Sequence, residues 1–276
     1  DDGEFLSTVD VYDPRTDAWK QVSSMPTCRR MHGGVAFDGK VYAVGGYNGD
    51  DGTLSTADVY DPQSDQWQPL AQMASARTEL AAAAAGGKIY AIGGENSDGD
   101  HMAAVEAFDP LLGAWAEVAS MSVARRDHAV AVVDGKIYVI GGEGANSIDL
   151  DTVEAYDPQA DSWQQVASMP HTRSRHAATS IGGKIYVTGG HVNDNSTNTL
   201  IVFDPQANTW TQLAGMGTSR AYHAAAVIGG KLYVFGGYTH PGGLMASVEA
   251  YDPISNTWAQ VSDSTSARDE FVAVAL

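Results

Sequence analysis

The sequence predicts an all-β propeller of six four-stranded antiparallel blades, because three features repeat with one period through the 276 residues. Tryptophan recurs at intervals of 47 or 48 residues, and so does an aromatic-Asp-Pro triplet. Glycine pairs such as Gly141-Gly142 keep the same interval. A fixed period of this length is the signature of a repeat architecture. The tryptophans are Trp19, Trp67, Trp115, Trp163, Trp210 and Trp258.

Residues 128–167 show the elements of one repeat in chain order. HAVAVV reads as a first strand, and Asp134-Gly135 is a hairpin turn that leads into the second strand, KIYVIGG. A polar loop follows, and then the third strand TVEAYD, which Asp-Pro ends, and the fourth strand SWQQVA. The alternation has the period of strands and not of helices. Four short antiparallel strands per repeat are the composition of a propeller blade.

The residue types suit these positions. The first strand is expected nearest the central axis, where space is least, so it is rich in small residues, as at Ala81 to Ala85. The glycine pair permits backbone angles or close approaches that a Cβ would block. Tryptophan on the outer strand is expected to pack between neighbouring blades.

One blade is predicted to be closed jointly by the two ends of the chain and to lack its second strand. Its parts are residues 1–23 and the C-terminal FVAVAL within 270–276. We expect about a dozen upstream residues, ending in a glycine pair, to supply that strand. A chain that begins at Asp1 would recruit a strand from a partner and would otherwise be monomeric. The other predicted blades are 29–71, 77–119, 125–167, 173–214 and 220–262, all in a single domain over 1–276.

The glycine pair, the Tyr-Asp-Pro turn and the tryptophan behind it resemble the kelch family over essentially the whole chain. GKVYAVGGYNG and STADVYDPQSDQW are similar to the kelch domains that follow BTB domains in ubiquitin-ligase adaptors, and HAAAVIGGKLYVFGG is similar to bacterial kelch proteins. The resemblance implies a six-bladed propeller that binds a protein or peptide.

Nine of the ten arginines precede a first strand, and five of the six lysines lie at its other end. Strand polarity therefore predicts one face with arginines and with the variable loops between second and third strands. Six arginines share a register, and for these a structural hydrogen bond to a neighbouring blade is the leading interpretation. The six are Arg29, Arg77, Arg125, Arg173, Arg220 and Arg268; the additional three, for which ligand binding is the preferred interpretation, are Arg30, Arg126 and Arg175.

The resemblance implies that these arginines, and the residues just after each glycine pair, line the ligand pocket. The latter are Tyr47, Glu95, Glu143, His191 and Tyr238. Arginine suits carboxylate recognition. Because Glu79, Asp127, Asp269 and Glu270 also lie near this rim, a ligand of mixed charge is as well supported as an acidic one.

Composition excludes several classes of protein. A net charge of −18 argues against phosphate-mediated binding of nucleic acid. Since the chain has one cysteine, Cys28, a cysteine-ligated zinc site is excluded, and no apolar run is long enough to span a membrane. His32, His128, His176 and His223 share a register, but sixfold spacing would hold them too far apart for a metal. We predict no metal and no cofactor.

The sequence therefore predicts a non-enzymatic protein- or peptide-binding module, with the substrate-recognition part of a ubiquitin-ligase adaptor as its finer form. A sugar-acid epimerase of the sialic acid type, in which a pocket glutamate works beside an arginine, is the alternative, and an actin-associated scaffold is another. The predicted location is cytoplasmic, or secreted if a signal peptide precedes the chain.

Overall fold

The computed structural model describes residues 5–276, which divide into two compact units. Unit 1 runs up to Arg126 and includes Leu276, and unit 2 runs from Asp127 to Ala275. Within the described residues, unit 1 contains two four-stranded blades and a two-stranded sheet, and unit 2 contains three four-stranded blades. All neighbouring strands pair antiparallel.

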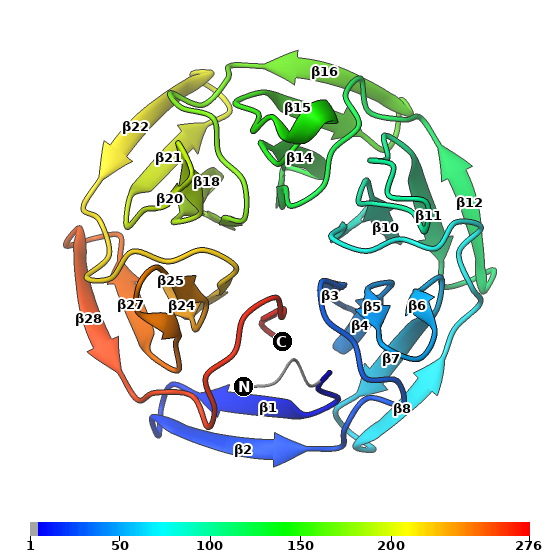
Figure 1. The fold of residues 1–276 in the computed structure, drawn as a ribbon, viewed down its shortest axis with the longest axis horizontal. Coiled ribbons are helices and arrows are strands. Elements are labelled where there is room, and N and C mark those ends of the chain that lie inside the picture. Colours follow the sequence, from blue (N-terminus) through cyan, green and yellow to red (C-terminus); the bar gives the residue numbers. More distant parts are fainter. Residues whose placement is uncertain (1–4) are drawn as a thin grey trace. The chain divides into compact units, whose positions relative to one another are not determined.

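In unit 1 the two-stranded sheet is followed by the two blades, whose strands lie side by side in chain order (Figure 1). The sheet consists of β1 (Val9–Asp13) and β2 (Ala18–Val22). The first blade consists of β3 (Gly33–Phe37), β4 (Lys40–Val44), β7 (Ala57–Asp61) and β8 (Gln66–Pro69), with a short hairpin of β5 (Tyr47–Asn48) and β6 (Gly52–Thr53) between its second and third strands. The second blade consists of β9 (Ala81–Ala85), β10 (Lys88–Ile92), β11 (Val105–Asp109) and β12 (Ala114–Val118).

Unit 2 repeats the blade three times. Its first blade consists of β13 (Ala129–Val133), β14 (Lys136–Ile140), β15 (Val153–Asp157) and β16 (Ser162–Val166), with the 3₁₀ turn η1 (Ala145–Ser147) in its loop. The second consists of β17 (Ala177–Ile181), β18 (Lys184–Thr188), β21 (Leu200–Asp204) and β22 (Thr209–Leu213), with the hairpin of β19 (His191–Val192) and β20 (Asn195–Ser196). The third consists of β23 (Ala224–Ile228), β24 (Lys231–Phe235), β27 (Val248–Asp252) and β28 (Thr257–Val261), with β25 (Tyr238–Thr239) and β26 (Gly243–Leu244).

The prediction of six blades is wrong, because residues 5–276 form five four-stranded blades. β1 and β2 remain a two-stranded sheet, and FVAVAL at the C-terminal end contains no strand. The jointly closed blade therefore does not form. A strand exists only through hydrogen bonds to a neighbour, and the described residues supply no second strand between these segments. The predicted start of that blade, residues 1–4, lies outside the described residues.

The glycine pairs have the backbone angles and the close approaches to other backbone that the sequence predicts. Gly45 and Gly46 both have positive φ, at 62° and 101°. A Cβ on Gly45 would lie 2.6 Å from the Arg77 carbonyl oxygen, and one on Gly46 would lie 2.7 Å from that of Arg30. Any other residue would therefore be strained and would also collide with backbone.

Hydrophobic cores lie between neighbouring blades of the same unit. In unit 1, Val44 and Val59 of one blade pack with Ile89 and Phe108 of the next. Small residues allow first strands to approach closely, since a Cβ on Gly33 would lie 2.9 Å from the Ala82 Cβ. This close approach explains why the first strand at Ala81–Ala85 consists of alanine.

Within each unit, an outer-strand tryptophan connects a blade to the sheet before it. Trp115 packs on Phe108 of its own blade, with ring centroids 5.3 Å apart. Its indole Nε1 donates a hydrogen bond to the Ala71 carbonyl, which lies just after β8 of the preceding blade, at 2.8 Å. Trp210 and Trp258 bond in the same way in unit 2.

Helical structure in residues 5–276 is confined to the single turn η1, so no helix there has the length and apolar character needed to cross a membrane.

Candidate functional site

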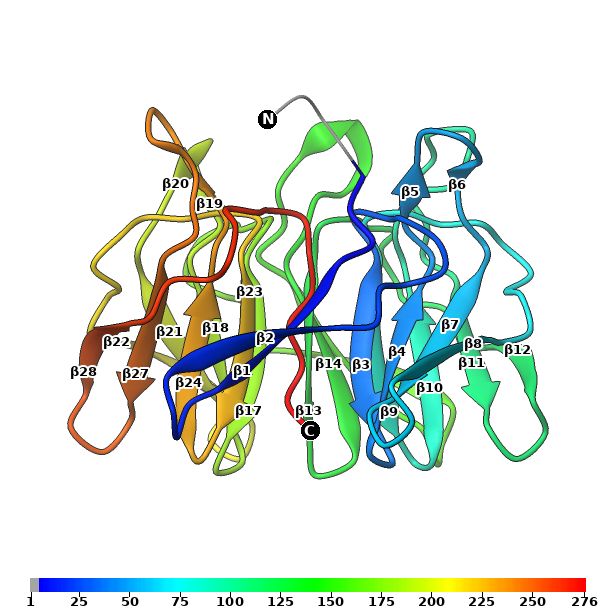
Figure 2. The ribbon, with the colours of Figure 1, turned by 90° about the horizontal axis from the view of Figure 1, so that it is seen from below.

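Strand direction places the arginine-bearing segments and the loops after the glycine pairs at the same edge of each blade. β9 runs away from Arg77 and β10 returns to Gly93-Gly94, because Ala81 pairs with Ile92 at that end. Figure 2 shows the β5–β6 hairpin of unit 1 projecting beyond the ends of its sheet strands. We call this edge the loop edge in each unit.

Five of the six arginines in register have buried side chains, namely Arg29, Arg77, Arg125, Arg173 and Arg220. We call these the buried arginines. Arg77 shows their geometry: Nη1 donates to the carbonyls of Gly93 and Ala104 at 3.1 and 2.9 Å, and Nη2 pairs with Glu106 at 2.7 Å. The side chain thus joins the second and third strands of its own blade.

The main chain of the same residue makes the link to the neighbouring blade. The Arg77 carbonyl accepts a hydrogen bond from the Gly46 amide at 2.9 Å, and Gly46 belongs to the preceding blade. We expected the side chain to make that link, but it bonds within its own blade. The acid partner is the residue two positions before the aromatic-Asp-Pro triplet, as in Arg220–Glu249 at 2.7 Å.

Arg173 lacks the carboxylate that other buried arginines have. The equivalent position in its blade holds Ile201, and Arg173 instead donates to the Gly189 carbonyl and to Thr199 Oγ1. Burial without a compensating carboxylate lowers the pKa of Arg173 to about 10.

Of the nine arginines that precede first strands, the other four are reached by solvent at the loop edge; they are Arg30, Arg126, Arg175 and Arg268. We call these the accessible arginines. Arg30 is exposed and lies over the rings of Phe5 and Tyr47, at 5.2 and 5.8 Å from their centroids. Arg268 donates to Ser266 Oγ at 2.8 Å.

Arg126 holds a group of acids in unit 1. Its Nη1 lies 3.0 Å from a Glu79 oxygen and 2.6 Å from a Glu95 oxygen. His101 Nε2 lies 3.7 Å from the same Glu95 oxygen. The guanidinium therefore faces two carboxylates, and its side chain is 21% exposed.

Arg175 is the centre of a larger group in unit 2. Its Nε and Nη2 pair with Asp127 and Glu143, both at 3.1 Å, and Nη1 lies 3.2 Å from His191 Nδ1. Its guanidinium carbon lies 5.2 Å from the centroid of Tyr222. We call these five residues the Arg175 cluster.

The electrostatics of the Arg175 cluster follow from burial and from this pairing. Burial acts to lower the pKa of Arg175, but Asp127, Tyr222 and Glu143 outweigh it and raise the pKa above its ordinary value. Burial, with Arg175 nearby, lowers the pKa of His191, so its imidazole is neutral at physiological pH. Burial raises the pKa of Asp149, which is backbone-paired to Glu143.

One further position recurs two residues after each arginine in register. From the sequence, we assigned only some of its residues to the site. Its residues have left-handed backbone angles with φ between 52° and 57°. In unit 2 they form a chain of main-chain hydrogen bonds, since the amide of Arg175 donates to Asp127 and that of Tyr222 donates to Arg175. The residues are Met31, Glu79, Asp127, Arg175, Tyr222 and Glu270. Non-glycine residues in this conformation cluster at functional sites.

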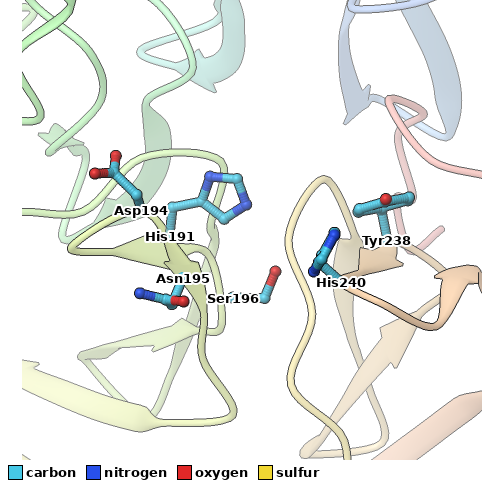
Figure 3. A pocket seen from close by; sticks show the side chains of 6 residues that line it. All are labelled: His191, Asp194, Asn195, Ser196, Tyr238 and His240. Carbon is cyan, nitrogen blue, oxygen red and sulfur yellow. The ribbon is translucent and has the colours of Figure 1, made fainter.

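An open cleft adjoins the Arg175 cluster in unit 2 (Figure 3). Its lining comes from the β19–β20 hairpin and from the segment that begins with β25, and it shares His191 with the cluster. The lining residues are His191, Asp194, Asn195, Ser196, Tyr238 and His240.

The structure brings together only some of the predicted site residues. In unit 2 it joins Arg175, Glu143 and His191 and places Tyr238 in the adjoining cleft, and in unit 1 it joins Arg126 with Glu95 and Arg30 with Tyr47. The buried arginines lie inside the blades. Sequence reasoning missed Tyr222 and the loop residues of the cleft; the register with Arg175 identifies the former, but a variable loop carries no such signal.

The four histidines in register are buried, and burial lowers the pKa of His32 and of His223 to about 3. Within residues 5–276, no group of three or more His, Cys, Asp or Glu side chains is arranged to hold a metal ion.

Comparisons with known proteins find β-propeller and kelch sequences that are similar to the repeats of this chain. A family model described as the Attractin/LZTR1 beta-propeller matches residues 41–275, and a Kelch motif model matches residues 1–26. Kelch-like protein 7 of Rattus norvegicus is 47% identical over 47 residues, which are 17% of this chain and 8% of that protein. Kelch-like protein 3 of Danio rerio is 48% identical over 44 residues, 16% of this chain and 7% of that protein.

The chain also has the fold of a solved structure entitled "Structure of YjhT". The TM-score is 0.81 at 18% sequence identity, and the match covers 92% of this chain and 89% of the other. The family models and the Kelch-like relatives confirm the predicted resemblance to kelch repeats.

Proposed function

Because the chain belongs to the Attractin/LZTR1 β-propeller family, we propose that it binds a protein or peptide partner through the loop edge of unit 2. The observation that carries the proposal is the Arg175 cluster. The Arg175 side chain is 21% exposed, and its guanidinium is held by two carboxylates and an imidazole and lies over a tyrosine ring. Such a preorganised group loses little side-chain entropy when a partner binds.

The neighbouring loops support a binding role. In unit 2 the β19–β20 and β25–β26 hairpins extend the loop edge of two neighbouring blades, and their sequences differ while the blade strands keep one pattern. Binding residues concentrate on loops that a rigid scaffold positions. Tyr238 and His191 offer flat rings with a polar end, which suit a protein interface.

Selection of random peptides displayed on phage tests this function. We expect enriched peptides whose binding to the purified chain is weakened at least tenfold by Tyr222→Ala and by Tyr238→Ala. Arg15→Gln is the matched control, because Arg15 is 87% exposed and pairs only locally with Asp13. A selection that enriches no peptide, or peptides indifferent to both tyrosine variants, would contradict the proposal.

The finer hypothesis is that the chain recognises the substrates of a ubiquitin ligase. It rests on the similarity to short segments of Kelch-like proteins, of which the chain matches 7 to 8% of the length. The coding region upstream of residue 1 tests it, because an adaptor requires BTB-like helices there.

A second candidate is an epimerase that acts on a sugar acid, and the group around Arg126 favours it. A carboxylate that abstracts a proton beside a guanidinium that binds the sugar carboxylate is a workable arrangement. Interconversion of the α and β anomers of N-acetylneuraminic acid, followed by NMR, tests it, because a base that takes the proton of the anomeric hydroxyl opens the ring. Equilibration faster than the spontaneous rate and slowed by Glu95→Gln would support the enzyme, and equilibration at the spontaneous rate would reject it for this substrate.

A further inference from the structure

The cleft of unit 2 has a lining rich in hydrogen-bond acceptors. Asp194 contributes a carboxylate, Asn195 and Ser196 contribute an amide and a hydroxyl, and Tyr238 contributes a phenol ring. Figure 3 shows the β19–β20 residues on one side and Tyr238 with His240 on the other. None of the six lining residues is a lysine or an arginine.

The residues next to His191, outside the lining of the cleft, add negative charge. Arg175, which contacts His191, is paired with both Asp127 and Glu143, so one guanidinium stands against two carboxylates. Unit 1 shows the same ratio, with Arg126 between Glu79 and Glu95. The accessible arginines of both groups therefore sit in acidic surroundings, and the whole chain carries a net charge of −18.

This arrangement disfavours the binding of an acidic ligand. Three nitrogens of Arg175 already face Asp127, Glu143 and His191, and one face of its guanidinium lies toward Tyr222. A carboxylate entering the cleft would approach Asp194 and would find no guanidinium or ammonium in the lining.

We propose that this cleft receives a lysine or arginine side chain of the partner, an inference that rests on the proposed protein-binding function. A cation over the Tyr238 ring gains a cation–π interaction. Its N–H groups can donate to Asn195 and Ser196, and Asp194 supplies the charge-assisted partner. The net negative charge of the chain also favours a basic segment over an acidic one.

The cleft is large enough for a lysine or arginine side chain. Its volume is about 320 Å³, near the lower end of the roughly 300–1,000 Å³ of small-molecule sites. The partner segment therefore inserts one basic residue, while its neighbours lie across the Arg175 cluster and the two hairpins.

Three eight-residue peptides of the same Gly-Ser backbone, with two positions occupied by Lys, by Gln or by Glu, provide the test. The imidazole NMR signals of His191 and His240 report occupancy of the cleft, and the whole chain is used. We expect the Lys peptide to shift both signals, the Gln peptide to shift them less, and the Glu peptide to leave them unchanged. Added salt should weaken the binding of the Lys peptide to the chain, because salt screens the attraction between exposed charges.

Asp194→Asn should weaken the Lys peptide about fivefold, as expected for one partly exposed ion pair. The matched control is Asp98→Asn, which makes the same change of charge at the equivalent position after the glycine pair in unit 1. Asp98 is exposed, and its replacement should leave the affinity within twofold of the parent chain.

Stronger shifts with the Glu peptide, or a Lys affinity unchanged by Asp194→Asn, would overturn the basic-residue inference and leave the protein-binding function standing. If no peptide shifts either histidine signal and phage selection also enriches nothing, both the inference and the proposed function fail.

Discussion

Arg29 and Arg30 are neighbours in the sequence but occupy opposite environments. Arg29 is 3% exposed, pairs with Asp58 and donates to the Gly45 carbonyl at 3.0 Å. Arg30 is exposed and rests on the rings of Phe5 and Tyr47. The difference shows that the arginines before the first strands are two sets with two roles: the buried arginines hold the blade together, and the accessible arginines shape the loop edge.

The largest effect is expected from Arg29→Met. Removing the guanidinium leaves the Asp58 carboxylate buried without a cation, which costs on the order of 3–5 kcal/mol of the free energy of unfolding. Urea denaturation followed by circular dichroism measures it. The double variant Arg29→Met with Asp58→Leu should recover most of the loss, because a buried pair can be replaced by apolar residues. A single variant as stable as the parent would erase the distinction between the two sets.

The second effect is a loss of stability in acid, which should come from the buried histidines. Burial, reinforced by Arg29 and Arg220 respectively, lowers the pKa of His32 and of His223 to about 3 in the folded chain. The unfolded chain therefore takes up protons first, so stability is full above pH 6.5 and falls as the pH drops from 6.5 towards 3. At pH 5 each histidine should cost about 2 kcal/mol.

Urea denaturation of His223→Gln at pH 7.5 and pH 5 checks this prediction. The variant should lose less stability between the two pH values than the parent chain loses. His171→Gln, at an exposed histidine, serves as the control and should keep the parental slope. Equal slopes for His223→Gln and the parent would refute the contribution of the buried imidazole.

Arg173→Met should cost less than Arg29→Met, about 1–3 kcal/mol. The blade of Arg173 has Ile201 at the position where the other blades have an acid, so loss of Arg173 leaves the Gly189 carbonyl without this donor and leaves no carboxylate unpaired. The same urea experiment compares the two variants directly. A loss equal to that of Arg29→Met would mean that carboxylate pairing is not what makes the buried arginines important.

The smallest effect on stability is expected from Arg30→Met, the matched partner of Arg29→Met. An exposed cation–π contact contributes roughly 0.5–1 kcal/mol, and methionine keeps part of the packing on Phe5 and Tyr47. The midpoint of urea unfolding should therefore stay close to that of the parent. A loss comparable to that of Arg29→Met would place Arg30 in the structural set.

Much of the fold could be predicted from local sequence. Asp134-Gly135 has the paired positive φ values of a tight hairpin, at 50° and 75°, and Asp61 of the Tyr-Asp-Pro triplet accepts a hydrogen bond from the Gln63 amide at 2.9 Å. These features act within a few residues, so the period of the sequence predicts them. The number of complete blades was mispredicted, because a first strand at FVAVAL depends on a distant pairing that local pattern does not report.

The candidate site was predictable only in outline. The sequence by itself determined the repeat, the strand direction and therefore the edge at which arginines and variable loops meet. Only the tertiary structure decided which arginines are buried, because the partner of Arg77 is Glu106, 29 residues away on another strand. It likewise decided that Arg175 meets Asp127, Glu143 and His191 from different segments of unit 2. Burial and pairing depend on neighbours in space, and a repeating sequence gives every blade the same register without stating which neighbours each side chain will have.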